Sequence, residues 1–397
     1  MPALRHRSFR LFLGSQFLSV TGLALQLIVV SWQVYRLTDS AFMLGLINFA
    51  SLLPGLPASL AAGVLSDRLS RRQLILTTET VLLGQALILA GLTWSGRIQV
   101  WHIFVLSIIW GVASALEQPA RMAFMADIVE PGDLSNAIAL NASTYNTAYI
   151  LGPALASLLI IPLGEAGCFF INAVSYVPVL AALLIIPAPP PLPTGGASSL
   201  TGSLREGFHY VYQHPTLLVL LLTIGVSSFG GMSYLSLMPA LVRETLGLGA
   251  RELGFLLTAA GIGAVIGALW VAGLKPVRRG AWLTLGAILA PLWLFGLSFS
   301  RALPLSLGLI VLTAAASALR NLLCNSFVQL LAERQYHGRV MSLYALLFNG
   351  MPRAGALVLG GVAELVGVSW ALTLGAALAL AWAVGLTIWQ PAVRRLE

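Results

Sequence analysis

Long apolar stretches recur along the whole chain, and short charged or turn-rich segments separate them. A helix that crosses the hydrocarbon core of a bilayer needs about 20 predominantly apolar residues, a length that each stretch approaches or exceeds. The pattern therefore predicts an all-α membrane protein with six spans on each side of a central break. The twelve expected spans are residues 10–35, 41–65, 73–94, 100–122, 136–161 and 167–187, then 215–241, 252–274, 280–300, 303–326, 339–365 and 369–390.

The central break is rich in proline and glycine. It contains the run PAPPPLPTGG, a composition that favours an extended or irregular chain. Beyond this run, Leu204, Phe208 and Val211 are spaced to form one face of a short surface helix. We therefore expect an N-terminal six-helix bundle over residues 1–187, a linker with a short amphipathic helix over 188–214, and a C-terminal six-helix bundle over 215–397.

The two halves of the chain are also related in sequence. A shift of 203 residues aligns Asn146 with Asn349 and Gly152 with Gly355. Parallel repeats of six spans, related by an axis along the membrane normal, are a known plan of secondary transporters. The alignment therefore predicts an internal duplication.

Composition narrows the class of protein. Apolar residues make up 58% of the chain and charged residues only 9%, whereas a soluble domain has about 25% charged residues. A water-soluble enzyme and an intrinsically disordered chain are both excluded by this balance. The net charge of +8 indicates basic cytoplasmic loops rather than a nucleic-acid surface, because such loops carry an excess of Lys and Arg.

The distribution of Lys and Arg predicts the orientation in the membrane. With a cytoplasmic N-terminus, fifteen of these residues fall on the cytoplasmic side and five on the other. The positive-inside rule then places both termini and the central linker in the cytoplasm. The first apolar stretch exceeds a signal-peptide core and has no small-residue cleavage site, so we expect it to be a retained span.

The sequence shows no motif for a cofactor or a covalent reaction. Cys168 and Cys324 lie far apart in apolar surroundings, which predicts a packing role. The five histidines have no metal-ligand spacing, and no G-x-x-x-x-G-K-[ST] loop is present. We therefore expect no metal, no cofactor, no nucleic-acid partner and no ATP hydrolysis within this chain.

The segment between the second and third spans carries a specific motif, GVLSDRLSRR at residues 63–72. It resembles the signature loop of the major facilitator superfamily, G-x-L-x-D-R-x-G-R-R/K, with a serine in place of the second glycine. Glycine permits close helix contact, an aspartate can accept hydrogen bonds at the next helix N-terminus, and arginines anchor at an anionic leaflet. The resemblance implies a role in conformational change for Gly63, Asp67, Arg68, Arg71 and Arg72.

Two further stretches, QPARMAFMADIVEPGDLSNAIALN at residues 118–141 and HGRVMSL at 337–343, resemble the branch that contains enterobactin exporters and macrolide-efflux proteins. Gly152 and Pro153 match an antiporter-type motif in part, with Ala156 and Ser157 in place of its trailing glycines. The resemblance implies a monomeric secondary transporter of the bacterial inner membrane. Such a protein exports a drug-like or siderophore-like small molecule by alternating access, with protons as the coupling ion and membrane lipids around it.

Other functions stay open at this level. The same fold could move lipids or lysophospholipids, or could import a solute. A membrane-embedded enzyme or a sensor would be a different class of protein. An enzyme needs a clustered nucleophile and base or a set of metal ligands, and the sequence shows no such cluster.

Ionisable residues inside the expected spans are candidates for function, because each costs at least about 2.5–3.5 kcal/mol at a helix centre. Glu117 and Arg121 are four residues apart and can form a local ion pair. Alternatively, Glu117 aligns with Arg320 of the second half, and spans 4 and 10 border the central cavity in the superfamily, so the two could close its cytoplasmic mouth.

Arg353 is either a cavity-facing cation for an anionic substrate or a partner of backbone carbonyls or of Glu79. We interpret Glu79 as a partner of the basic loop rather than a proton carrier.

Amide and aromatic side chains mark candidate substrate contacts. Asn141, Tyr145 and Tyr149 are spaced four residues apart and share one helix face. Such groups in an otherwise apolar cavity suit a bulky amphipathic ligand, and interhelical hydrogen bonding is the alternative. The candidate substrate-binding residues are Gln26, Asn141, Tyr145, Asn146, Tyr149, Asn349 and Arg353.

Overall fold

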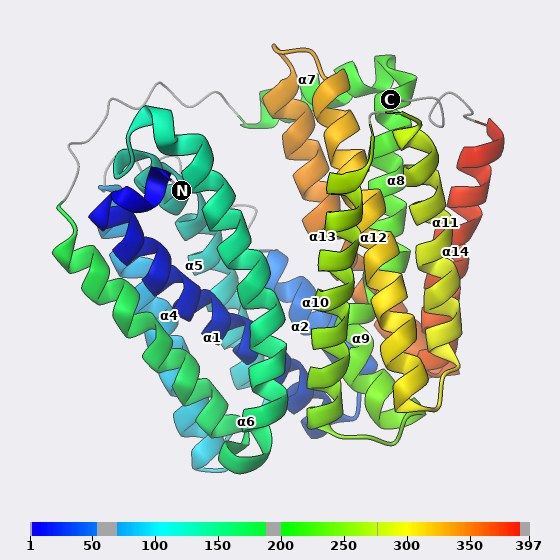
Figure 1. Cartoon of the computed structure of the whole chain (residues 1–397). Helices are drawn as coiled ribbons and strands as arrows, with labels where there is room; N and C mark the ends of the chain where they lie inside the picture. The colour runs from blue at the N-terminus through cyan, green and yellow to red at the C-terminus, as the bar shows by residue number, and fades with distance from the viewer. Residues whose placement is uncertain (1, 54–69, 188–199, 276, 390–397) are drawn as a thin grey trace. The chain divides into compact units, whose positions relative to one another are not determined.

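The computed structural model describes residues 2–53, 70–187, 200–275 and 277–389. The regular secondary structure of these residues consists of helices, without strands (Figure 1). Ten helical segments among them are long and apolar enough to cross a membrane, and a shorter apolar helix accompanies them.

The described helices fall into two sets along the chain. In the first half they are η1 (Pro2–Arg5), α1 (Arg7–Thr38), α2 (Ala41–Leu52), α4 (Arg71–Trp94), α5 (Val100–Asp127), η2 (Pro131–Asp133) and α6 (Leu134–Ile185). In the second half they are α7 (Leu200–Gln213), α8 (Pro215–Gly231), α9 (Tyr234–Ala240), η3 (Leu241–Thr245), α10 (Ala250–Gly273), α11 (Arg279–Ser298), α12 (Leu303–Leu331), α13 (His337–Val366) and α14 (Val368–Trp389).

The long helix α6 contains two of the expected spans. Gly164 inside it has φ +67° and non-helical geometry, a backbone conformation that glycine adopts without a steric penalty. The kink falls in the gap that the sequence pattern leaves between residues 161 and 167. The all-α membrane class is confirmed, and with α6 counted twice eleven of the expected spans correspond to described helices. Of the expected span 41–65 the structure describes the apolar helix α2, and residues 54–65 lie outside the described residues.

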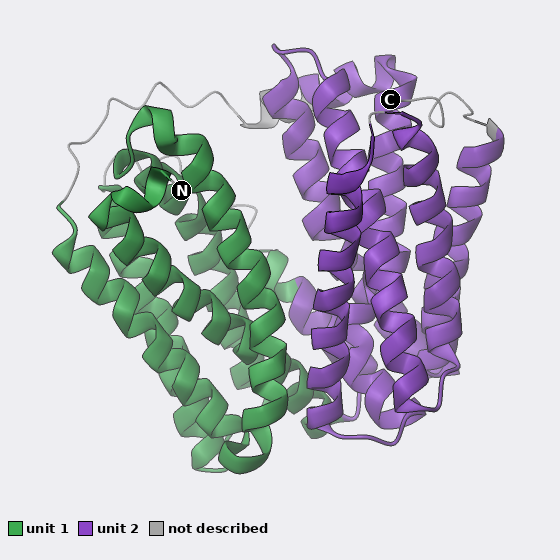
Figure 2. Cartoon of the chain, in the orientation of Figure 1, with its two compact units in different colours: residues 1–38, 50–197 green, residues 39–49, 198–397 purple. Residues whose placement is uncertain are grey.

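The chain forms two compact units. Unit 1 comprises residues 1–38 and 50–197, and unit 2 comprises 39–49 and 198–397 (Figure 2). The segment 39–49 packs within unit 2, where Asp39 pairs with Arg243 at 3.1 Å. The Glu364 carboxylate accepts hydrogen bonds from Ser40 Oγ at 2.6 Å and from the Phe42 backbone N–H at 3.1 Å. An acid at the start of α2 stabilises that helix, because its first N–H groups lack intrahelical partners.

Unit 1 is held together by an apolar core shared by α1, α4, α5 and α6. Phe12 of α1 and Phe124 of α5 are both almost fully buried, and their rings meet edge to face with centroids 5.3 Å apart. Gly152 of α6 lies so close to α1 that a Cβ there would stand 2.4 Å from the Cβ of Ala24. This glycine is therefore required for the α1–α6 contact.

Unit 2 has its own core, which α8, α11, α12, α13 and α14 share. The helix α7 joins this core through Tyr210 and Val211, which are 5% and 3% exposed. Phe208, by contrast, is 61% exposed. The short helix that the sequence predicted is present as α7. The side chain of Leu204 lies outside the description, so the apolar face shared by Leu204, Phe208 and Val211 stays a prediction.

Candidate functional site

A row of hydrogen-bonded amides crosses the interior of unit 1. Gln26 of α1 is 3% exposed, and its Nε2 donates to Gln85 Oε1 of α4 at 3.2 Å. Asn172 Nδ2 of α6 donates to Gln26 Oε1 at 2.7 Å. Gln26 thus forms interhelical hydrogen bonds of the kind that the sequence left as the alternative to substrate contact.

Acidic and basic groups gather further along the same interior. Glu117 and Arg121 form the local ion pair expected from their spacing, between Glu117 Oε1 and Arg121 Nη2. The Gln16 amide connects this pair to a second acid: its Oε1 accepts from Arg121 Nη1 at 2.8 Å, and its Nε2 donates to Glu79 Oε1 at 3.4 Å. Gln16, Glu79 and Glu117 are each at most 1% exposed.

The interpretation of Glu79 as a partner of the basic loop is wrong. Arg71 Nη1 instead donates to Asp127 Oδ1 at 2.5 Å, at the end of α5. Arg72 Nη2 donates to the Leu184 carbonyl at 2.9 Å, at the end of α6. Both arginines lie at the start of α4, about two turns from Glu79, and turn toward helix ends instead.

The serine that departs from the signature motif has a structural role. Ser70 caps α4: its Oγ accepts from the Gln73 N–H at 3.2 Å, and its own N–H donates to Gln73 Oε1 at 3.1 Å. This reciprocal capping satisfies two backbone donors at the helix start. The other motif residues, Gly63, Asp67 and Arg68, lie outside the described residues.

An aromatic and amide face runs along the first part of α6. The Arg121 guanidinium lies over the Tyr145 ring, 5.6 Å from its centroid. Asn141 is half-buried and its Nδ2 lies 3.9 Å from Met122 Sδ, whereas Asn146 is exposed and Tyr149 is 48% exposed. Four of the predicted substrate-binding residues therefore lie on one helix of unit 1. Gly152 and Pro153 follow on the same helix, with Gly152 against α1.

Unit 2 contains a buried arginine with incomplete pairing. Arg320 of α12 is 0% exposed, and its Nε and Nη2 donate to Asn321 Oδ1 at 3.1 and 2.9 Å. Its Nη1 has no hydrogen-bond partner, and no described carboxylate forms a salt bridge with it. The gate between Arg320 and Glu117 joins residues of different units and stays a prediction.

A second polar row on α12 was not predicted. Asn321, Asn325 and Gln329 are spaced four residues apart, and Gln329 Nε2 donates to Asn325 Oδ1. Tyr344 Oη of α13 donates to the Asn321 carbonyl at 3.2 Å. The same four-residue spacing that singled out Asn141 and its neighbours could have revealed this row.

The two predicted residues of α13 are placed less deeply. Asn349 is exposed, and its Nδ2 donates to the Ala345 carbonyl of its own helix at 3.0 Å. Arg353 follows one turn later and is half-buried. Their part in substrate binding stays a prediction.

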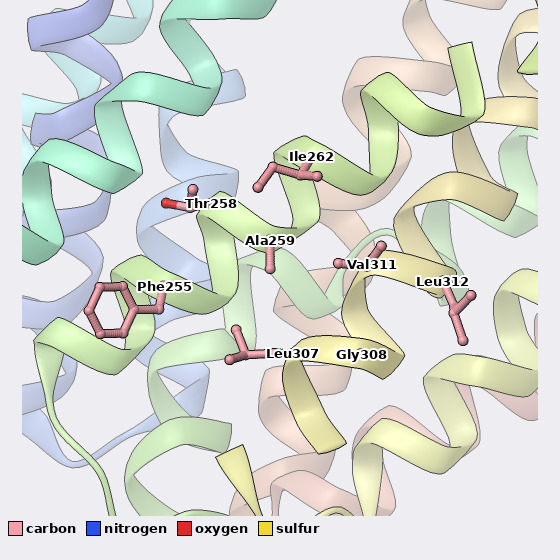
Figure 3. A pocket seen from close by; sticks show the side chains of 8 residues that line it. All are labelled: Phe255, Thr258, Ala259, Ile262, Leu307, Gly308, Val311 and Leu312. Carbon is pink, nitrogen blue, oxygen red and sulfur yellow. The ribbon is translucent and has the colours of Figure 1, made fainter. Parts of the chain in front are cut away.

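Unit 2 also has an apolar groove between α10 and α12, with a volume of about 760 Å³. Figure 3 shows Phe255, Ile262, Leu307 and Val311 among its lining side chains. Its one hydroxyl, on Thr258, donates to the Gly254 carbonyl of its own helix at 2.7 Å. The groove contains none of the predicted substrate-binding residues, and it offers an apolar ligand no polar group for orientation.

One cluster near the N-terminus has the side chains of a metal site. His6, Glu130 and Asp133 each place a donor atom within 4.8 Å of the others. Arg5 Nη2 lies 2.9 Å from Glu130 and 3.0 Å from Asp133, and His6 Nε2 lies 2.8 Å from Asp133. Arg5 already pairs with both carboxylates. We therefore interpret the cluster as a set of ion pairs that holds the N-terminal segment against η2.

The apolar helical spans of the described residues, the two compact units and the charges buried inside the helices are those of a multi-pass membrane transporter, and the fold is of the major facilitator type. Solved structures agree in fold. The nucleoside transporter NupG matches with a TM-score of 0.77 at 13% identity, over 96% of this chain and 98% of that one. A bacterial homolog of the human lysosomal transporter Spinster, inward-facing and unoccupied, matches with a TM-score of 0.71 at 14% identity, over 98% and 96%.

The sequence comparison gives the family. The profile described as transmembrane secretion effector matches residues 1–396, and the chain belongs to that family. The chain is 28% identical to the enterobactin exporter EntS of Shigella boydii serotype 18 over 380 residues, 91% of this chain and 86% of that protein. It is equally similar to EntS of Escherichia coli O1:K1 over 384 residues. The protein is therefore a transporter rather than an enzyme.

Proposed function

We propose that this transporter exports a bulky, siderophore-like small molecule from the cytoplasm and that inward proton flow drives the export. The similarity to enterobactin exporters along 91% of the chain carries the proposal. In this arrangement the protein lies in the bacterial inner membrane as a monomer, with both termini in the cytoplasm, as the excess of basic residues on that side supports.

The aromatic and amide face of α6 supports a substrate of this kind. Tyr145 and Tyr149 offer rings for stacking, and Asn141 and Asn146 offer donors and acceptors on the same helix. Arg121 adds a cation at 5.6 Å from the Tyr145 ring centroid. A ligand with aromatic rings and anionic oxygens, such as a catecholate, complements this combination because it can stack and accept charge-assisted hydrogen bonds.

The proposal is tested by transport into inside-out proteoliposomes under an imposed pH gradient. We expect accumulation of a catecholate siderophore that depends on the gradient, and little accumulation of a cationic drug. Tyr149→Ala should weaken siderophore transport, whereas Tyr212→Ala, a matched change of an exposed tyrosine on α7, should not. Equal transport of both ligands by the wild type would refute the siderophore specificity.

A lipid or lysophospholipid is the second candidate substrate. The apolar groove of α10 and α12 favours it, because about 760 Å³ lined by hydrocarbon suits an acyl chain (Figure 3). Movement of a labelled lysophospholipid in the same proteoliposomes, without siderophore transport, would select this alternative. Transport in the opposite direction only would identify an importer.

A further inference from the structure

Two buried acids of unit 1 share a single basic partner among the described residues. Glu79 of α4 and Glu117 of α5 are 1% and 0% exposed, and both lie within helices that cross the membrane. Arg121 is the cation that interacts with them. Two ionised carboxylates beside one guanidinium would leave an uncompensated negative charge in a medium that solvates it poorly.

The hydrogen bonds show which acid lacks compensation. Glu117 Oε1 forms the ion pair with Arg121, whereas Glu79 Oε1 receives only the neutral Gln16 amide at 3.4 Å. Gln16 is itself oriented by Arg121 Nη1, which donates to Gln16 Oε1 at 2.8 Å. The amide therefore presents its N–H to Glu79 and cannot supply a charge.

The second oxygen of each acid is buried and receives no donor. Glu79 Oε2 and Glu117 Oε2 are both buried and have no hydrogen-bond partner, and the two carboxyls lie close enough to share a hydrogen bond. The Tyr176 hydroxyl of α6 is buried beside them, also without a partner. A single proton on Glu79 makes an O–H donor, which satisfies a carboxylate oxygen of Glu117 and removes the excess charge.

We infer that the Glu79–Glu117 pair of unit 1 binds one exchangeable proton and is the proton-coupling site of this transporter. The coupling role rests on the proposed proton-driven export, whereas the binding of the proton does not. Few titratable groups of the described residues face Glu79: α5 contributes Glu117 and Arg121, and α6 contributes Tyr176. The helix α1 contributes the Gln16 amide, which does not titrate.

The step is a simple ionisation. The Glu79 O–H bond breaks, the electron pair stays on the carboxylate, and the proton leaves to water. Arg121 is the least buried of the three charged side chains, with 16% of its side chain exposed, and the proposed path of the proton passes along it. The carboxylate formed then competes with Glu117 for the same guanidinium. Proton release thus changes which acid Arg121 binds and links protonation to the positions of α4 and α5.

Infrared difference spectra of the purified protein test the binding of the proton. A pH titration of the wild type should show the carbonyl stretch of one protonated carboxyl. That band should disappear in Glu79→Gln and in Glu117→Gln. It should persist in Glu165→Gln, a matched control that removes an acid already paired with Arg36 at 2.7 Å in the same unit. A band that persists in both pair variants would overturn the assignment.

Transport assays test the coupling. Glutamine mimics the protonated acid, so Glu79→Gln should keep substrate exchange without a pH gradient. Accumulation driven by a pH gradient should fall about tenfold or more, within the range typical of coupling between two sites. Glu117→Gln provides a second variant in case Glu79→Gln does not fold. If substrate accumulation by the wild type does not depend on the pH gradient, proton-driven export is refuted. If the pH gradient drives accumulation by the wild type and by both variants to the same extent, only the Glu79–Glu117 assignment is refuted.

Discussion

Replacing Arg320 with methionine removes a buried charge and keeps an unbranched side chain of comparable reach. In unit 2 this guanidinium is 0% exposed, its Nη1 has no partner, and its other nitrogens share one amide oxygen. A buried cation without a carboxylate destabilises the bundle that contains it. We therefore expect Arg320→Met to stabilise the protein while it impairs transport.

The magnitude follows from the contacts. A central arginine costs about 2.5–3.5 kcal/mol on insertion scales. The lost hydrogen bonds to Asn321 Oδ1 offset about 1 kcal/mol of that gain, because Asn321 is half-buried and its oxygen can reach water. The net stabilisation is about 2 kcal/mol, which corresponds to an increase of about 4–8 °C in the unfolding temperature for a unit of this size.

The assay combines thermal unfolding of the purified protein, followed by tryptophan fluorescence, with transport in proteoliposomes. Arg301→Met is the matched control, because Arg301 is exposed at the start of the loop before α12 and should change the midpoint little. Arg320→Lys keeps the charge and should show no gain in stability. A lower midpoint for Arg320→Met would refute the reasoning and make Arg320 a structural residue.

Three further predictions follow from individual positions. Asp67→Asn should leave the protein folded and reduce transport, with a coupling loss of about 1–3 kcal/mol; unchanged transport by the folded variant would remove the signature loop from the mechanism. Arg353→Ala should weaken binding of an anionic ligand more than of a cationic one, with partial rescue by Arg353→Lys; equal losses for both ligands would contradict this. Gly152→Ala should lower the free energy of unfolding by about 1–3 kcal/mol, because the new Cβ would stand 2.4 Å from the Cβ of Ala24. Gly91→Ala is the control and should leave the free energy of unfolding unchanged, because no atom lies within 4 Å of a Cβ at that position.

The spans were predictable from the sequence because each depends on local composition alone. The break at Gly164 lies in the gap between two apolar stretches, and only its positive φ required the structure. The packing of residues 39–49 with unit 2 was not predictable. An apolar pattern indicates that a helix face is buried, but it does not say which neighbour buries it.

The buried polar groups were predictable only in part. The Glu117–Arg121 pair follows from a spacing of four residues, which places both side chains on one helix face. The environment of Glu79 depends on Gln16, 63 positions earlier, and on Glu117, 38 positions later. No local rule relates such distant positions, so proximity along the chain to the basic loop gave the wrong partner.

The predicted alignment of the two halves places opposite charges at one position. The shift of 203 residues lays Glu117 on Arg320, and both side chains are completely buried in their own units. In unit 1 Glu117 has a second acid, Glu79, beside it, so the total charge of the pair changes when a proton binds to Glu79. In unit 2 the arginine has no described carboxylate partner, so its charge is fixed, because a guanidinium does not lose its proton in proteins. At position 320 an apolar residue of similar volume would be less costly for folding than an arginine without a carboxylate partner. With the proton-binding pair assigned to unit 1, one unit responds to protons, whereas the other carries a constant positive charge at the position that the predicted repeat aligns with Glu117.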